Sequence, residues 1–215
     1  MKTTNFTISL LGFALLLGSS FTAAQTVAGT LLNIQHEWAS CQYNLVEKDL
    51  KISCLEKVII ANENALKITP ASSKLKIWLA INNSSLAGAK GGLGALSLVK
   101  KSKQLLEEVI AVNPAVLEGS AYTSLGSLYY QVPGWPIGFG NDKKAEVMLK
   151  KALAINPNGI DPNYFYADFL AQNGRKKEAI AHFKKALLAS LRPARPLADK
   201  GRLQEIANKL KELEN

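Results

Sequence analysis

Few side chains in this 215-residue chain are of the types that carry out catalysis. It has only two histidines, His36 and His182, far apart in the sequence, and His182 lies in a lysine-rich stretch where a solvent-exposed imidazole is expected. No nucleophile, base and orienting group occur together at spacings that would assemble a catalytic site. Asp161 precedes Pro162 and is expected to cap a helix, and Asp168 is expected to make a surface or inter-helix hydrogen bond. The sequence therefore predicts no catalytic residues, no cofactor and no enzymatic activity.

The two cysteines, Cys41 and Cys54, are the best candidates for covalent chemistry. They are placed symmetrically about the polar stretch Glu47–Asp49, which we interpret as the turn between two antiparallel helices. Residues equally far from such a turn face each other, so a disulfide can bridge them. In a reducing compartment they would instead be free buried thiols. No histidine or further cysteine lies near them at zinc-ligand spacing. We therefore predict a Cys41–Cys54 disulfide and no metal site.

Two glycine-rich stretches separate helical segments. The first, residues 87–94, contains Lys90, and a glycine-rich turn that leads into a helix can bind phosphate through backbone N–H groups. The spacing of a P-loop is absent and no strand precedes the stretch. A tight reversal with close packing is therefore the favoured interpretation over nucleotide binding.

The second stretch, residues 133–142, is more distinctive because Trp135, Ile137 and Phe139 alternate with glycines and prolines. These side chains either pack against the neighbouring hairpin or present an apolar contact to a ligand or partner. Packing is the expectation for Trp135. Asn141 and the residue after it are expected to cap the next helix.

The N-terminal segment has the order of a secretory signal peptide. Lys2 is followed by an apolar run over residues 8–17 and by small residues up to Ala24, which predicts cleavage before Gln25. The alternative is a retained membrane anchor, but the apolar run is about half of the ~20 residues that span a bilayer. We expect a periplasmic or secreted protein that is not integral to the membrane after cleavage.

The chain is basic, with a formal net charge of +9. Its lysines include five adjacent pairs along helix faces, a pattern typical of solvated surfaces. The charge favours anionic partners in general but indicates no nucleic-acid binding.

Apolar residues recur at helical spacing throughout, and the sequence predicts an all-α fold. Four hairpins are expected at about 28–68, 72–112, 116–155 and 161–190, and the first three are each followed by a proline that stops the second helix. The pairs Ala152–Leu153 and Ala186–Leu187 lie 34 residues apart, while the earlier units are longer because of the glycine-rich stretches.

The last two hairpins resemble the tetratricopeptide repeat, in which small residues let paired helices approach closely and large ones fill the gaps between hairpins. The positions that carry the resemblance are Tyr122, Leu125, Gly126, Tyr129, Ala145, Leu149, Ala152 and Pro157, and then Ala167, Leu170, Ala179, Phe183 and Ala186. The first two hairpins match weakly. The resemblance implies a right-handed α-solenoid over residues 25–191. The architecture is also loosely similar to the T-component of tripartite (TRAP) transporters, without a diagnostic motif.

Residues 192–215 are expected to form a stiff, proline-containing link and a last amphipathic helix, with Leu203, Ile206, Leu210 and Leu213 on one stripe. An open array must cover its last apolar face, so we interpret this helix as a cap.

We expect an interaction scaffold whose stacked first helices present a groove to another protein. The candidate contact residues there are Tyr122, Tyr129, Asn163 and Tyr166, and those on the loop edge are Trp135 and Phe139. The tyrosines and asparagine are also suited to packing between repeats. A small-molecule carrier with a pocket under residues 133–140 is the alternative, and a structural component of the cell envelope is a third possibility. A closed cavity beneath that loop would favour the carrier, and an open groove would favour the scaffold.

Overall fold

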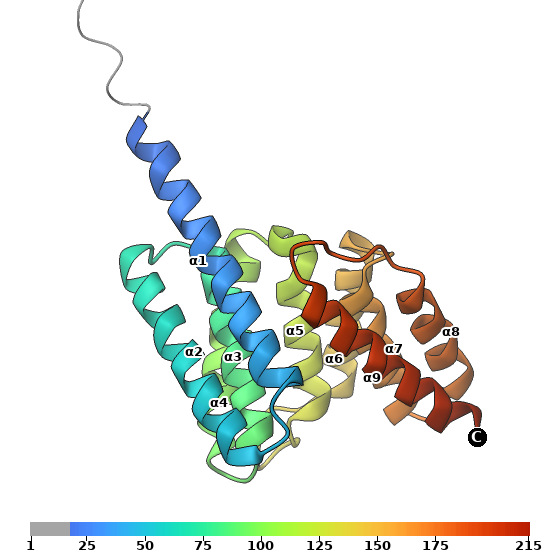
Figure 1. The fold of residues 1–215 in the computed structure, drawn as a ribbon. Helices are drawn as coiled ribbons and strands as arrows, with labels where there is room; N and C mark the ends of the chain where they lie inside the picture. The colour runs from blue at the N-terminus through green and yellow to red at the C-terminus, as the bar shows by residue number, and fades with distance from the viewer. Residues whose placement is uncertain (1–17) are drawn as a thin grey trace, which may run out of the picture.

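The computed structural model describes residues 18–215, which form nine α-helices and no strand (Figure 1). The helices are α1 (Gly18–Tyr43), α2 (Lys48–Ile68), α3 (Ser73–Lys90), α4 (Ala95–Val112), α5 (Val116–Gln131), α6 (Asp142–Ile155), α7 (Ile160–Gln172), α8 (Lys176–Leu187) and α9 (Pro196–Glu214). The predicted signal peptide lies outside the described residues up to position 17, and its predicted cleavage point falls within α1. Cleavage stays a prediction. No described helix is both long and apolar enough to cross a membrane.

The predicted all-α fold is confirmed, and the eight helices from α1 to α8 pair as four hairpins. Asn141 caps α6 as predicted, because its side-chain oxygen accepts a hydrogen bond from the Lys144 amide at 2.9 Å. The first predicted glycine-rich turn is wrong in its extent. Residues 87–90 continue α3, since they keep its hydrogen-bond ladder, and the reversal occupies only Gly91–Gly94.

The hairpins stack in two layers. The first helices of the hairpins (α1, α3, α5 and α7) each contact the next first helix, whereas the second helices among the described residues contact no other second helix. Small residues permit the close approach. A Cβ atom added at Gly126 of α5 would lie 2.7 Å from Cγ of Leu149 on α6, and Ala145 and Ala152 beside it are fully buried. The first helices therefore form an inner layer, as the repeat pattern requires.

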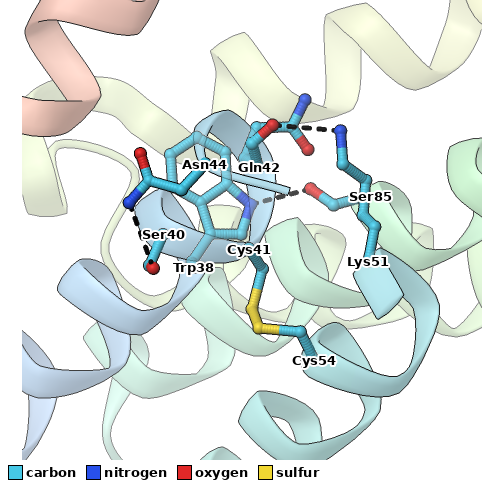
Figure 2. The surroundings of a disulfide bond; sticks show 8 residues. All are labelled: Trp38, Ser40, Cys41, Gln42, Asn44, Lys51, Cys54 and Ser85. Atoms are coloured by element: carbon cyan, nitrogen blue, oxygen red, sulfur yellow. Dashed lines mark hydrogen bonds between the residues drawn. A yellow bond between two sulfur atoms is a disulfide. The ribbon is translucent and has the colours of Figure 1, made fainter. Parts of the chain in front are cut away.

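The first hairpin is cross-linked by the predicted disulfide (Figure 2). Cys41 and Cys54 are bonded with their Cα atoms 5.6 Å apart, and Cys41 is fully buried. Trp38, one turn before Cys41, donates a hydrogen bond from its indole Nε1 to Oγ of Ser85 on α3 at 2.8 Å. The disulfide therefore lies next to the contact that joins the first two hairpins.

Reducing this disulfide should destabilise the N-terminal hairpins. The bridge closes a loop with a sequence separation of 13 residues, which corresponds to about 3 kcal/mol in the chain-entropy model. We expect the double variant C41S/C54S to melt at a lower temperature by circular dichroism. The unmodified protein should yield no alkylatable thiol until it is unfolded and reduced. Equal melting curves for the two proteins would contradict this assignment.

Helix α9 contacts both the last hairpin, through α8, and the first hairpin, through α1. In Figure 1 it runs from beside α1 toward the end of α8. Ala198 near its start belongs to the apolar core of the first hairpins, and Ile206 and Leu210 belong to the core of the later ones. Gly201 packs directly on the Tyr43 ring, where no Cβ atom would fit. The array is thus closed across its inner face.

The segment before α9 is also a turn and not the extended link predicted from its two prolines. The Arg195 amide donates to the Arg192 carbonyl at 2.8 Å. Nε2 of His36 on α1 hydrogen-bonds the Ala194 carbonyl at 2.6 Å. Side-chain contacts of Arg192, described below, override the extended geometry that proline favours.

Deleting residues 196–215 should destabilise both halves of the array. The deletion exposes the apolar surfaces that α9 covers on α1 and on α8, and each buried Leu or Ile contributes about 1.5–3 kcal/mol. We expect a lower melting temperature and a tendency to aggregate in size-exclusion chromatography. Deletion of residues 214–215 alone is the control and should leave the melting temperature nearly unchanged. An equally stable, monomeric 1–195 protein would show that closure is dispensable.

Candidate functional site

Closure by α9 leaves a cavity of about 450 Å³ at the inner face of the array. Its walls come from every inner helix and from α9, with Trp38 on α1, Ser85 on α3, Thr123 on α5, Tyr164 on α7 and Arg202 on α9. The predicted open groove of stacked first helices is therefore covered, because α9 and the turn before it lie across it.

An arginine–carboxylate network holds α9 in place. Arg192 donates to Asp199 from its backbone amide and from Nε (2.7 Å to Oδ1), and its Nη1 donates to Asp161 at 2.7 Å. Arg202 donates from Nε to the other oxygen of Asp161 at 3.1 Å and from Nη1 to Glu205 at 2.6 Å. Asp161 on α7 thereby binds both the turn and α9.

The role of Asp161 differs from the predicted helix cap. Gly159 is the residue that caps α7, and Asp161 lies in the first turn, where its carboxylate faces the two guanidinium groups. Burial alone would raise the pKa of Asp161, but Arg202 and Arg192 outweigh it and hold the pKa well below its usual value. The carboxylate therefore stays ionised throughout the neutral and mildly acidic range.

Aromatic rings form the apolar part of the cavity wall. Trp38 and Trp78 meet edge to face with their centroids 5.5 Å apart, and the Arg202 guanidinium lies 4.0 Å from the centroid of Tyr164. Burial raises the pKa of Tyr164 and of Tyr43 to about 12 each. Both phenols therefore remain protonated at any physiological pH.

Arg195 is the arginine of the turn without a carboxylate partner among the described residues. Its guanidinium carbon lies 4.9 Å from the centroid of Trp78, and its Nε is buried with no hydrogen-bond acceptor. Burial and the nearby Arg192 lower its pKa from the usual value, yet an arginine remains charged near neutral pH. The cavity wall thus holds one unneutralised guanidinium.

The arginine network is not among the features predicted from the sequence, although a signal was present. The chain contains four arginines among its 26 basic residues, and three of them fall between positions 192 and 202. Arginine differs from lysine in offering a planar fork of donors for buried carboxylates. Such clustering in a lysine-rich chain indicates buried ion pairs.

The groove residues predicted to contact a partner are mostly inside the protein. Tyr129, Asn163 and Tyr166 are buried, and Tyr122 is half-buried beneath Lys151, whose Nζ lies 5.4 Å from the ring centroid. They pack between helices, which is the alternative role that the sequence also allowed.

Asn163 accounts for the position of His182 as well. The Asn163 side chain donates to the Pro157 and Gly159 carbonyls, at 2.9 Å each, so its oxygen is left to accept from Nδ1 of His182 at 3.0 Å. His182 also packs edge-on against Tyr166. The predicted solvent-exposed histidine is therefore wrong, because the ring is half-buried between α7 and α8 and burial lowers its pKa. Asp168 makes the predicted inter-helix bond, accepting from the Tyr130 hydroxyl at 2.8 Å.

The loop of residues 133–140 presents its tryptophan to solvent. Trp135 is 91 % exposed and Ile137 is 57 % exposed, whereas Phe139 packs edge-on against Tyr129 at 5.9 Å. The expectation that Trp135 packs is wrong, because Phe139 takes the place against the hairpin. The cavity at the inner face contains no residue of the loop, and the pocket predicted under the loop stays a prediction.

Comparison with known proteins agrees with the repeat architecture. Residues 139–195, from the end of the loop through α6, α7 and α8 to the turn, match the tetratricopeptide repeat family. This segment is therefore similar to that family. A solved structure, a thermophilic tetratricopeptide repeat protein (TTC0263) from Thermus thermophilus, is 18 % identical with a TM-score of 0.43, covering 85 % of this chain and 98 % of its own. No curated protein matches the chain, and none of these matches supports the looser similarity to a TRAP transporter component.

Replacing Asp161 should loosen the closure in a pH-dependent manner. Asp161→Asn removes the acceptor shared by two guanidinium groups and should cost about 1–3 kcal/mol at pH 7, as for hydrogen bonds to charged groups. Because its pKa is depressed in the folded protein, this contribution is present above the unfolded pKa of about 3.9 and is lost as the pH falls below it. Denaturant unfolding at pH 7, 5 and 3 measures the difference.

The matched control for that variant is Glu212→Gln. Glu212 is exposed, and its carboxylate forms a long surface ion pair, 3.6 Å from Nζ of Lys209. A surface pair of this kind contributes at most ~1 kcal/mol. If Asp161→Asn has an effect no larger than Glu212→Gln at pH 7, the network does not hold α9.

Proposed function

We propose that this protein is an exported interaction protein that binds a protein partner through the edge formed by residues 133–140. The observation that carries the proposal is the 91 % exposure of Trp135. Tetratricopeptide arrays commonly offer their inner face, but here α9 covers that face. A protein partner then binds an exposed outer surface, and the edge at residues 133–140 is the one that presents an exposed tryptophan.

Hydrogen bonds hold the backbone of the loop that carries Trp135. The Gly140 amide donates to the Pro133 carbonyl at 3.0 Å, and the Asn141 amide donates to the Tyr129 carbonyl at 2.7 Å, while Phe139 anchors the loop on Tyr129. A loop whose backbone is already ordered loses little conformational entropy when it is buried by a partner. Tryptophan is also enriched among the residues that dominate binding energy at interfaces.

Charge around the loop indicates the kind of partner. Nζ of Lys103 on α4 lies 5.8 Å from the Phe139 centroid and is paired with Glu107 at 2.8 Å. Nζ of Lys144 lies 5.6 Å from the Tyr129 centroid, and neither it nor the exposed Lys143 beside it forms a salt bridge among the described residues. A protein surface with an apolar pocket bordered by acidic side chains complements this arrangement.

Export to an oxidising compartment fits the covalent structure. The Cys41–Cys54 disulfide persists in such a compartment, and disulfides are rare where glutathione and thioredoxin keep thiols reduced. Together with the signal-peptide pattern, it supports a periplasmic or secreted location.

Replacing Trp135 by alanine should abolish partner binding without loss of stability. The side chain is almost fully exposed, so the free energy of unfolding should change by less than about 0.5 kcal/mol. A photo-crosslinking amino acid at position 135 should yield a defined protein adduct in envelope preparations. The same probe at Val46, which is 97 % exposed at the α1–α2 turn, is the control. Identical adducts from both positions, or none from position 135, would overturn the proposal.

A further inference from the structure

We propose that the inner cavity is a binding site for a small aromatic monocarboxylate, whose carboxylate is bound by Arg195. This site is independent of the loop edge, because no residue of 133–140 lines the cavity. It is also distinct from the pocket expected from the sequence under that loop.

The charge of the cavity wall determines which charge a bound ligand should carry. Four cations line it, Lys51, Arg192, Arg195 and Arg202. Asp161 and Glu205 line the cavity beside them, and Asp199, which lies outside the lining, pairs with Arg192, so one positive charge is left over. Burying a charge without a partner is unfavourable. A ligand with a single negative charge therefore completes the site, and a dianion would exceed what the wall can neutralise.

Geometry points to Arg195 as the residue that takes the carboxylate. Arg192 and Arg202 already donate to protein carboxylates, and Nζ of Lys51 donates to the Gln42 carbonyl at 3.0 Å. Arg195 makes no side-chain hydrogen bond within the described chain, and its Nε is buried. A carboxylate suits the planar fork of a guanidinium group, which binds both oxygens at once.

The aromatic wall determines the rest of the ligand. Trp78 lies against the Arg195 guanidinium and meets Trp38 edge to face, and Tyr164 and Phe165 line the same cavity. A flat ring attached to the carboxylate can therefore contact the accessible edges of these aromatic rings while its charged end reaches Arg195. An aliphatic acid of similar size would fill the volume but would lose the ring contacts.

Unbonded hydroxyl groups on α5 provide additional polar contacts. Ser120, Thr123 and Ser124 line the cavity, and their hydroxyls make no hydrogen bond within residues 18–215. They can donate to a carboxylate oxygen or to a ring substituent. The volume of about 450 Å³ falls within the range of small-molecule sites and is too small for a folded peptide segment.

The tryptophans of this chain allow a direct test. The chain has three, of which Trp38 and Trp78 line the cavity and Trp135 is exposed elsewhere. In a Trp135→Phe background, all indole fluorescence therefore comes from the cavity wall. The probe is 4-nitrobenzoate, whose nitro group quenches nearby indole, and 4-nitrobenzamide is its uncharged counterpart.

We expect saturable quenching by 4-nitrobenzoate and at least tenfold weaker binding of the amide. Arg195→Gln should weaken the acid at least tenfold and leave the amide unchanged. Arg175→Gln is the matched control, because Arg175 pairs with Glu146 and Glu178 on the surface and does not line the cavity. If Arg195→Gln fails to fold, the Trp135→Phe protein alone still provides the test. Its relative affinity for the acid and the amide shows whether the cavity prefers a negatively charged ligand.

Three results would overturn the proposal. One is equal affinity for the acid and the amide, and another is unchanged affinity in a folded Arg195→Gln protein. The third is tighter binding of 4-nitrophenyl phosphate than of 4-nitrobenzoate, which would mean that a dianion is the preferred ligand. None of these three results depends on whether Trp135 binds a partner. The cavity proposal and the loop-edge proposal can therefore be tested and rejected independently.

Discussion

The structure depends on one carboxylate. Asp161, in the first turn of α7, accepts hydrogen bonds from Arg192 in the closing turn and from Arg202 in α9. Without it, the two guanidinium groups would face each other with only Asp199 and Glu205 between them, and α9 would keep only the longer Lys209–Asp168 ion pair to α7 among the described residues. A linear stack of hairpins ends in two apolar faces that must be covered. Here a single helix covers surface at both ends, because it is bound in the middle by Asp161.

Closure changes what the repeat architecture can do. An open array leaves its inner face accessible along its length, whereas in this chain that face lines a partly open cavity of about 450 Å³. The residues expected to contact a partner in the groove, such as Asn163 and Tyr166, are instead used to pack α7 against α8 and its neighbours. The exposed tryptophan, Trp135, lies instead on the outer edge of the array.

Local pattern predicted the helices well, and long-range contacts explain what it missed. The hairpin prolines, the asparagine cap and the paired cysteines act within one turn or one hairpin, so their consequences can be derived from spacing. The partner of Asp161 lies 31 residues away at Arg192 and 41 away at Arg202, and no local rule connects them. The loop shows the same limit of local sequence patterns. The alternation of apolar residues with glycine and proline indicated that an aromatic side chain could pack against the hairpin, but it did not distinguish Trp135 from Phe139. The position of Tyr129, against which Phe139 packs, decides between them.

Cavity and closure are physically coupled, since the same short segment supplies both. Arg195, proposed to bind the ligand, lies between Arg192 and Arg202, which hold the closing helix on α7. A ligand that contacts Arg195 and Trp78 together can bind only while the turn is docked. By mass action it stabilises that docked state by RT ln(1 + [L]/Kd), about 2.7 kcal/mol at a hundredfold excess over Kd. Binding would therefore act first on the contact between the turn before α9 and Trp78 on α3, and so favour the state in which the inner face is covered.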